Sequence, residues 1–326
     1  MKGGVVVAGQ FVEFSFGSQG MEAPLKARLS VPERVNAETG LTTLIHGWGC
    51  GRTQFDHMVP FCEAMNLYGL QIEYRGSGEA SGNGVFDVPY EMGKLQAIDA
   101  LRAVHEALRL YPAINTKRLF LIGGSGGGHN VLQAMAFAPN TFALTVALAP
   151  ISRPTNRFDV QEGGYRNDPK PRSGTEFKLD ADLGWGWEGT ALGKDKHFTP
   201  AEWDIRDCQR PQHVSVVRCP VVLVHGSRDE VVDVRHSLDM AKALIDAGKR
   251  VSLHLVDGGD HGCALSFATP AFPLGGLLEQ FSAPALRELT TDGNTDFDRR
   301  ETVSLGPWAV KYESGIPELV EQRTGA

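Results

Sequence analysis

The sequence has no long hydrophobic run and no secretory leader pattern, and these absences exclude two classes of protein. No stretch of its 326 residues approaches the roughly 18 consecutive apolar residues of a membrane-spanning helix. The apolar run at residues 5–8 stops too early to be the core of a signal peptide. We therefore expect a cytoplasmic protein without a membrane partner.

Cysteine pairs and excess basic charge are also missing. The five cysteines are scattered and odd in number, with no C-x-x-C pair and no paired Cys/His spacing, so neither a disulfide framework nor a zinc site is indicated. We expect no metal and no cofactor. The net charge of -7 gives no general attraction for nucleic acid. Hydrophobic content of 42% and charged content of 22% are those of an ordinary globular chain.

What the sequence does contain is a strand, a glycine-flanked turn and a helix around one serine. Residues 119–122 are an apolar strand pattern, and residues 127–138 are an apolar helix pattern. Between them, Gly123-x-Ser125-x-Gly127 is the nucleophile-elbow pattern, in which a sharp turn lifts a serine clear of the sheet. A Gly-Ser-Gly run is equally the pattern of an ordinary tight turn, so this motif alone does not decide between the two.

Strand and helix patterns alternate along most of the chain. Strand patterns cover residues 5–16, 22–31, 41–45, 70–74, 119–122, 144–149, 221–224 and 251–256. Helix patterns cover residues 53–65, 89–110, 127–138 and 234–247. The first two strands, separated by residues 17–20, indicate an antiparallel hairpin at a sheet edge. The remaining alternation predicts a mostly parallel sheet with helices on both faces, whose functional residues gather at the carboxyl ends of the strands.

Two of the later strands end in reactive side chains. The strand at 221–224 is followed by His225-Gly-Ser-Arg-Asp229, and the strand at 251–256 by Asp257-Gly-Gly-Asp-His261. A serine, an acid and a histidine that follow three different strands in this chain order have the order of the α/β-hydrolase triad. This order favours a catalytic serine over an ordinary turn.

Three more segments carry motifs of one enzyme superfamily. Residues 46–49 read His-Gly-Trp-Gly, residues 73–81 read Glu-Tyr-Arg-Gly-Ser-Gly-Glu-Ala-Ser, and residues 219–232 contain the proposed acid. They resemble the H-G-x-G oxyanion segment, the D-x-R-G-x-G-x-S turn with Glu73 in place of Asp, and the acid-bearing segment of prolyl-oligopeptidase-like and acyl-esterase serine hydrolases. Over most of residues 41–265 the chain thus resembles the α/β-hydrolase superfamily, which implies an eight-stranded sheet with an inserted cap.

Acyl transfer then assigns a role to each motif residue. Ser125 is the expected nucleophile, His261 the base that takes its proton, and Asp229 the acid that orients the imidazole. The backbone N–H groups of Trp48 and Gly126 are expected to receive the oxyanion.

Other side chains remain alternatives for these roles. The other acids near the triad motifs are Glu230, Asp233 and Asp260, and the other candidate bases are His46, His129, His225 and His254. Cys50 lies beside the expected oxyanion segment, but it is off the elbow where a nucleophile belongs.

The chain divides into a hydrolase core, a cap and a C-terminal extension. The core covers residues 1–150 and 219–290, the cap residues 151–218 and the extension residues 291–326. Glycine, proline and aromatic residues replace the alternation in the cap, where we expect Trp185 and Trp187 to wall the substrate pocket or to pack at a subunit contact. We expect residues 302–312 to add a strand that covers a sheet edge or exchanges with a second subunit.

Our preferred function is a serine hydrolase that cleaves a carboxylic ester of a small or medium-sized substrate through an acyl-enzyme. A peptidase or amidase is the alternative, for small peptides, because the chain shows no N-terminal propeller of the prolyl-oligopeptidase type. A lyase or a non-catalytic ligand-binding protein on the same fold is a third class. We expect a small-molecule substrate and no nucleic-acid partner, and self-association stays open.

Overall fold

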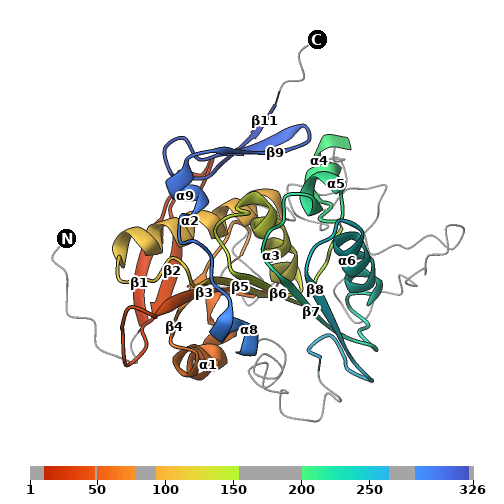
Figure 1. The fold of residues 1–326 in the computed structure, drawn as a ribbon, viewed down its shortest axis with the longest axis horizontal. Helices are drawn as coiled ribbons and strands as arrows, with labels where there is room; N and C mark the ends of the chain where they lie inside the picture. Colours follow the sequence, from red (N-terminus) through yellow and green to blue (C-terminus); the bar gives the residue numbers. More distant parts are fainter. Residues whose placement is uncertain (1–10, 48–49, 78–92, 154–199, 264–282, 323–326) are drawn as a thin grey trace, which may run out of the picture.

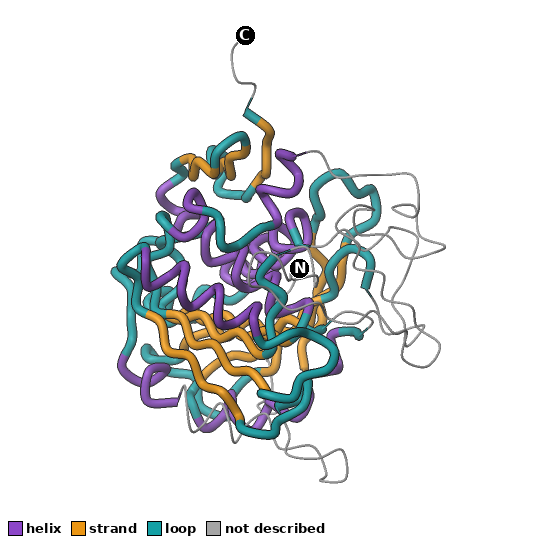
Figure 2. The backbone as a smooth tube through the Cα atoms, turned by 90° about the vertical axis from the view of Figure 1, so that its right-hand side faces the viewer, coloured by secondary structure: helices purple, strands orange, loops and turns teal. Residues whose placement is uncertain are grey.

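The structure is a computed structural model that describes residues 11–47, 50–77, 93–153, 200–263 and 283–322. At its centre lies an eight-stranded sheet with helices on both faces (Figure 1, Figure 2). The strands are β1 (Phe11–Phe16), β2 (Leu25–Ser30), β3 (Gly40–Ile45), β4 (Leu67–Ile72), β5 (Leu119–Gly124), β6 (Leu144–Leu148), β7 (Val221–Gly226) and β8 (Val251–Val256). Their order across the sheet is β1-β2-β4-β3-β5-β6-β7-β8. The predicted α/β-hydrolase fold is confirmed.

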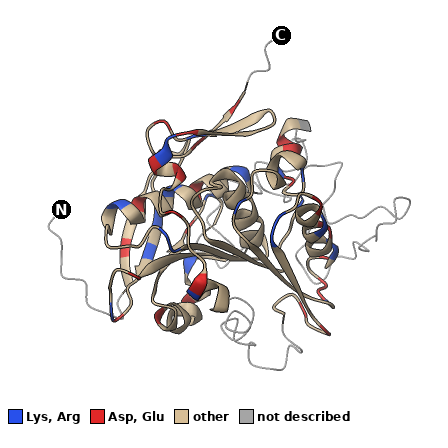
Figure 3. Ribbon diagram, in the orientation of Figure 1, with Lys and Arg blue, Asp and Glu red and all other residues tan. Residues whose placement is uncertain are grey.

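Strand pairing and burial explain the sequence pattern. β1 pairs antiparallel with β2, and β2 with β4, so the hairpin predicted at one edge is confirmed. All other neighbouring strands are parallel. The inner strands are short apolar runs because helices cover both of their faces. Charged residues lie on helices, loops and outer strands, while β5, β6 and β7 carry none (Figure 3).

Two groups of helices cover the two faces of the sheet. The helices are η1 (Arg52–Met58), α1 (Val59–Ala64), α2 (Lys94–Leu110), α3 (Gly126–Phe137), α4 (Pro200–Arg206), α5 (Pro211–Val214), α6 (Arg235–Asp246), α8 (Ala283–Glu288) and α9 (Asp296–Arg299). Alternate residues of β5 point to opposite faces, so Leu121 packs with α2 and α3, and Phe120 packs with α1 and α8. No helix of the described ranges is long and apolar enough to cross a membrane.

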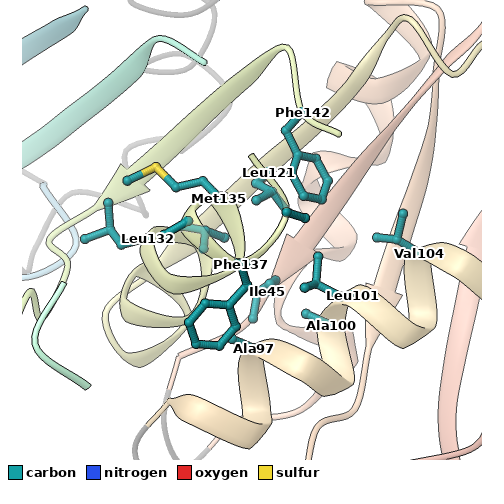
Figure 4. Close-up of a cluster of buried hydrophobic side chains, with 14 of the residues drawn as sticks. Ile45, Ala97, Ala100, Leu101, Val104, Leu121, Leu132, Met135, Phe137 and Phe142 are labelled. Carbon is teal, nitrogen blue, oxygen red and sulfur yellow. The ribbon is translucent and has the colours of Figure 1, made fainter. Parts of the chain in front are cut away.

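The helix that follows Ser125 is held rigidly. Every residue of α3 is buried. On one side, Phe137 of α3 lies in a cluster with Ala97 and Leu101 of α2 (Figure 4). Small residues such as Ala97 let two helices approach closely, and dense packing leaves such an element little freedom. The backbone at the start of α3 therefore has a fixed position relative to the sheet.

The helix predicted over residues 53–65 is two elements instead of one. A 3-10 helix, η1, comes first, and α1 begins only at Val59. Phe55 has non-helical backbone angles (φ -100°, ψ 20°). Pro60, near the start of α1, has no N–H to donate to the preceding turn, so one continuous α-helix cannot run through it.

The C-terminal extension differs from the prediction. A turn at Gly306 (φ 69°) divides the expected strand, and a separate antiparallel sheet forms from β9 (Thr302–Leu305), β10 (Trp308–Lys311) and β11 (Glu318–Glu321). This sheet lies over the helical layer and not along an edge of the main sheet (Figure 1). The buried Tyr312 hydroxyl donates to the Phe137 carbonyl at the end of α3, at 2.9 Å. The extension is thus part of the packing that fixes α3.

The segment 151–218 is described only at its ends. Residues 154–199, with Trp185 and Trp187, lie outside the described residues, so the cap and its two tryptophans stay predictions. The described end includes α4 and α5, which pack on the helical layer: the Gln133 side chain in α3 donates to the Ile205 carbonyl at 2.9 Å.

Candidate active site

Ser125 lies on a strained turn between β5 and α3. Its backbone has φ 55° and ψ -120°, a conformation that residues with a side chain rarely adopt. The neighbouring glycines make the turn possible. A Cβ on Gly123 would lie 2.3 Å from the Gly127 carbonyl oxygen, and a Cβ on Gly127 would lie 2.0 Å from the Ile45 carbonyl oxygen. The elbow predicted from the glycine spacing is therefore present, with its strain of about 1–3 kcal/mol held by the packed helix.

Replacing Gly127 by alanine should destabilise the protein. The new methyl group would collide with backbone of β3, which cannot move without disturbing the sheet, so we expect the free energy of unfolding to fall by about 1–3 kcal/mol. Gly124→Ala is the matched control, because the nearest atom to its Cβ would be 3.9 Å away. Urea unfolding of both variants measures the difference. Equal stability of the two would contradict the close contact at Gly127.

Asp229 and His261 form a hydrogen-bonded pair at the carboxyl ends of β7 and β8. His261 Nδ1 lies 2.8 Å from Asp229 Oδ2. The Asp229 side chain is fully buried, whereas the His261 side chain keeps 27% of its surface exposed. The imidazole is thus anchored through Nδ1, and its other nitrogen remains available to a reacting group. This is the acid and base arrangement that the sequence predicts.

The Asp229 carboxylate is strongly stabilised in its charged form. Burial alone would raise its pKa, but hydrogen bonds from His225 and His261 outweigh burial and hold the pKa of Asp229 well below the usual range. Its Oδ1 also accepts the backbone N–H groups of Val231 and Val232, at 2.8 and 2.9 Å. A carboxylate held in its charged form suits the task of orienting an imidazole and stabilising its cation.

Ser125 and His261 line one pocket of about 150 Å³, together with Gln54, Phe55, His57, Gly124, Leu148, Gly262 and Cys263. No hydrogen bond joins the two catalytic candidates in the part of the chain that the structure describes. Catalytic hydrogen bonds are often long or misaligned without substrate and tighten in the complex. The structure therefore pairs the acid with the base and places the serine in the same pocket.

The oxyanion segment lies directly against the elbow. A Cβ on Gly47 would lie 3.5 Å from Ser125 Cβ. The next residue, Trp48, lies outside the described residues, and its N–H role stays a prediction. Gly126 is the first residue of α3, so its N–H is one of the donors at a helix start that have no partner within the helix. A donor of this kind is what the expected oxyanion role requires.

Two residues to which the sequence analysis gave no role brace this segment. Gln54 Oε1 accepts the Gly47 N–H at 2.7 Å. The Tyr74 hydroxyl reaches the carbonyl oxygens of His46 and Gly47 at 3.0 and 3.2 Å, and its ring stacks on His46 at 4.3 Å between centroids. Gln54 comes from the 3-10 helix η1, where a single glutamine has no recognisable pattern. The strand-end position of Tyr74 in the Glu73-Tyr-Arg-Gly motif is the only signal for its role.

The alternative bases do not fit the site as well as His261 does. Burial lowers the pKa of His46 to about 4 and the pKa of His129 to about 4. Both rings are fully buried, and His129 Nδ1 lies 2.9 Å from the Ile151 carbonyl oxygen. His254 lies within β8, and His225 contacts Asp229 instead of the serine. Burial also raises the pKa of Cys50, which disfavours a reactive thiolate there.

These buried histidines predict acid sensitivity. An unfolded histidine has a pKa of about 6.5, so between pH 6.5 and pH 4 the unfolded state binds more protons than the folded state. Stability should therefore be complete above about pH 6.5 and fall as the pH approaches 4, by on the order of 3 kcal/mol for a residue such as His129. Urea unfolding across this range measures the slope. His129→Gln should flatten the slope, and an unchanged slope in that variant would contradict the assignment.

No group of three or more His, Cys, Asp or Glu side chains in the described ranges is arranged to hold a metal ion. The chemistry that the described site can perform is nucleophilic attack by a serine hydroxyl with a histidine as proton acceptor.

Comparison with known proteins agrees with this site. The sequence profile of the prolyl oligopeptidase family matches residues 53–269. Dipeptidyl peptidase 4 of Felis catus is 22% identical over 199 residues, which are 61% of this chain and 22% of that protein. The acylamino-acid-releasing enzyme of Arabidopsis thaliana is 21% identical over 255 residues, which are 75% of this chain and 30% of that protein. The chain thus spans less than a third of the length of these two relatives.

Solved structures show the same fold. The acylaminoacyl peptidase of Pyrococcus horikoshii has a TM-score of 0.64 at 19% identity, over 86% of this chain and 42% of that chain. A puromycin-hydrolyzing peptidase of Mycobacterium tuberculosis has a TM-score of 0.61 at 21% identity, over 83% of this chain and 38% of that chain. Because the family profile covers more than half of the sequence, the chain belongs to the prolyl oligopeptidase family of α/β-hydrolase serine hydrolases.

Proposed function

We propose that the protein hydrolyses a peptide or amide bond of a small substrate through an acyl-enzyme on Ser125. One observation carries this proposal: the His261 imidazole, anchored on the buried Asp229 carboxylate at 2.8 Å, lines the same pocket as the serine of the nucleophile elbow. These are the three parts that acyl transfer needs, and they come from three separate strand ends.

The reaction follows from their positions. Ser125 Oγ attacks the substrate carbonyl carbon while His261 Nε2 takes the hydroxyl proton, and the oxyanion of the tetrahedral intermediate accepts hydrogen bonds from Gly126 N–H and Trp48 N–H. As the carbon–nitrogen bond breaks, His261 gives that proton to the leaving amine. A water molecule then attacks the acyl-enzyme in the same way, which releases the acid and restores the serine.

Family membership supports a peptide bond as the bond that is cleaved, whereas the sequence alone favours an ester bond. The matched family is named for an oligopeptidase, and the relatives and solved structures reported above are named as peptidases or as an acylamino-acid-releasing enzyme. The described wall of the pocket is partly apolar. It includes Phe55, Leu148 and Cys263 around a volume of about 150 Å³, which supports a small apolar group beside the scissile bond.

A substrate panel tests the proposal. Aminoacyl and dipeptidyl p-nitroanilides with small apolar side chains are offered beside p-nitrophenyl esters, and an active-site label, a fluorophosphonate, is applied to the same preparation. We expect labelling of Ser125 and turnover of at least one anilide. Ester turnover without any anilide turnover would return the assignment to an esterase. A protein that took no label and cleaved nothing would refute the serine mechanism.

A further inference from the structure

Asp229 is held by a second histidine, which the triad mechanism does not use. His225 lies at the end of β7, is fully buried, and places its Nε2 3.1 Å from Asp229 Oδ2. We infer that His225 is a positioning residue that fixes the triad carboxylate, and so the direction of the His261 imidazole. This inference rests on the proposed function, because it assigns to His225 a role in the same reaction.

The contacts of His225 determine where its hydrogen lies. Nε2 faces two acceptors, Asp229 Oδ2 at 3.1 Å and the Val232 carbonyl oxygen at 3.0 Å. A carbonyl oxygen cannot donate, and the Asp229 carboxyl is ionised because its pKa is held low. Nε2 must therefore carry a hydrogen, which it shares between the carboxylate and the turn that follows it.

The other ring nitrogen fixes the plane of the imidazole. Nδ1 lies 2.7 Å from the hydroxyl oxygen of Ser237, a buried residue of α6. His225 is thus held at one end by a packed helix and at the other end by the Asp229 turn. A ring fixed at both nitrogens presents its N–H in one direction only, which is what a positioning group requires.

Without His225 the carboxylate would lose one of four donors. Oδ1 accepts the backbone N–H groups of Val231 and Val232, and Oδ2 receives Nδ1–H of His261 and the shared hydrogen of His225. Four donors match the four lone-pair sites of a carboxylate. Removal of the His225 donor would leave the buried Oδ2 with the partly exposed His261 as its remaining partner among the described residues, so less would hold the pair in line.

The sequence suggested His225 as an alternative base, but in the structure it is not positioned to act as one. Both of its nitrogens already have partners, and it does not line the pocket with Ser125. Its spacing, four residues before the acid in one turn, is what brings it to Asp229 Oδ2.

Three variants and a control test the inference. His225→Phe keeps the ring volume and removes both nitrogens. His225→Gln restores an N–H near the position of Nε2, and Ser237→Ala removes only the hydroxyl that fixes the ring. The control is His213→Phe, which changes another buried histidine that has no hydrogen bond with Ser125, Asp229 or His261 in the described residues. Each is assayed for kcat and KM on the anilide or ester that the wild type cleaves, and for thermal stability.

We expect His225→Phe to lower kcat by up to about 100-fold while KM changes little, since the carboxylate acts on the chemical step and not on substrate binding. His225→Gln should recover most of that loss, and Ser237→Ala should fall between them. His213→Phe should lower thermal stability without changing kcat. If His225→Phe does not fold, Ser237→Ala and His225→Gln carry the test.

The outcomes separate the two proposals. An inactive, unlabelled wild type would refute the proposed function itself. An active wild type whose His225→Phe or, where that variant does not fold, Ser237→Ala keeps full kcat would overturn the inference alone. The same holds if His225→Gln is as slow as His225→Phe, because a restored donor would then have no effect.

Discussion

Replacing Ser125 by alanine is expected to reduce kcat by at least about 10⁴-fold, because no other hydroxyl lies at the elbow to form the acyl-enzyme. The fold should survive the change. The Ser125 side chain is only partly buried, and the strained backbone at this position is held by contacts of Gly123 and Gly127. Hydrolysis of the wild-type anilide substrate measures the loss, and thermal unfolding checks that the variant is folded.

A second serine serves as the control. Ser215, at the end of α5, is exposed, and among the described residues its hydroxyl contacts only the Gln212 carbonyl, at 3.5 Å. Ser215→Ala should therefore keep wild-type kcat and accept the fluorophosphonate label, while Ser125→Ala takes none. Activity in Ser125→Ala above one hundredth of the wild type would mean that another group attacks the substrate.

Asp229→Asn is expected to lower kcat by about 10⁴-fold with little change in KM. An amide in place of the carboxylate can direct an N–H toward His261 Nδ1, which forces the imidazole into the tautomer that cannot take the serine proton. It also removes the negative charge that stabilises the imidazolium. Initial rates over a range of anilide concentrations separate kcat from KM.

The matched control for this variant is Asp233→Asn. Asp233 lies four residues away and was an alternative acid in the sequence, but its carboxylate accepts the Arg235 backbone N–H at 2.9 Å, outside the pair with His261. We expect its kcat to stay within about twofold of the wild type, as for a residue outside the reacting groups. Equal losses in the two variants would remove the special role of Asp229.

Stability should respond to acid through the same carboxylate. Because the folded pKa of Asp229 lies below the unfolded value of about 3.9, its ionised form stabilises the protein above that pH, and this contribution is lost as the pH falls further. This loss lies below the pH range in which the buried histidines act.

The elbow and the strand ends could be predicted from the sequence because their constraints are local. Gly123 and Gly127 must be glycines because any Cβ there would lie within 2.3 Å of backbone atoms. The spacing of these two glycines around Ser125 therefore predicts the geometry of the turn. The acid and the base each follow a short apolar strand, and parallel strands bring such ends to one edge of a sheet. The order of serine, acid and histidine then sufficed to name the pair that the structure joins at 2.8 Å.

Other features depend on contacts that no sequence motif describes. Gln54 holds the oxyanion segment by one hydrogen bond, which its side-chain oxygen accepts from Gly47 N–H. Any side chain with a carbonyl group at this position could accept the same bond, so the glutamine has no distinguishing pattern in the sequence. His225 and Asp229 were recognised as separate candidates, but their contact depends on the shape of one turn. The C-terminal sheet was expected as a single strand because Gly306 and Pro307, which divide it, lie inside one apolar stretch.

The sequence could not decide between an ester and an amide substrate. The motifs that carry the resemblance describe the reaction centre, and the same reaction centre acts on both kinds of bond. Family membership favours amides, and the group that the pocket accepts depends on its wall, which among the described residues includes Phe55, Leu148 and Cys263.

The most direct test of the triad is a crystal structure of the protein after reaction with a small peptidyl phosphonate. Our account predicts a bond between phosphorus and Ser125 Oγ, with His261 Nε2 within about 3.2 Å of that oxygen or of the leaving-group position, and Nδ1 still on Asp229. A phosphonate bound to another side chain, or an imidazole that stays out of reach of the modified serine, would contradict it.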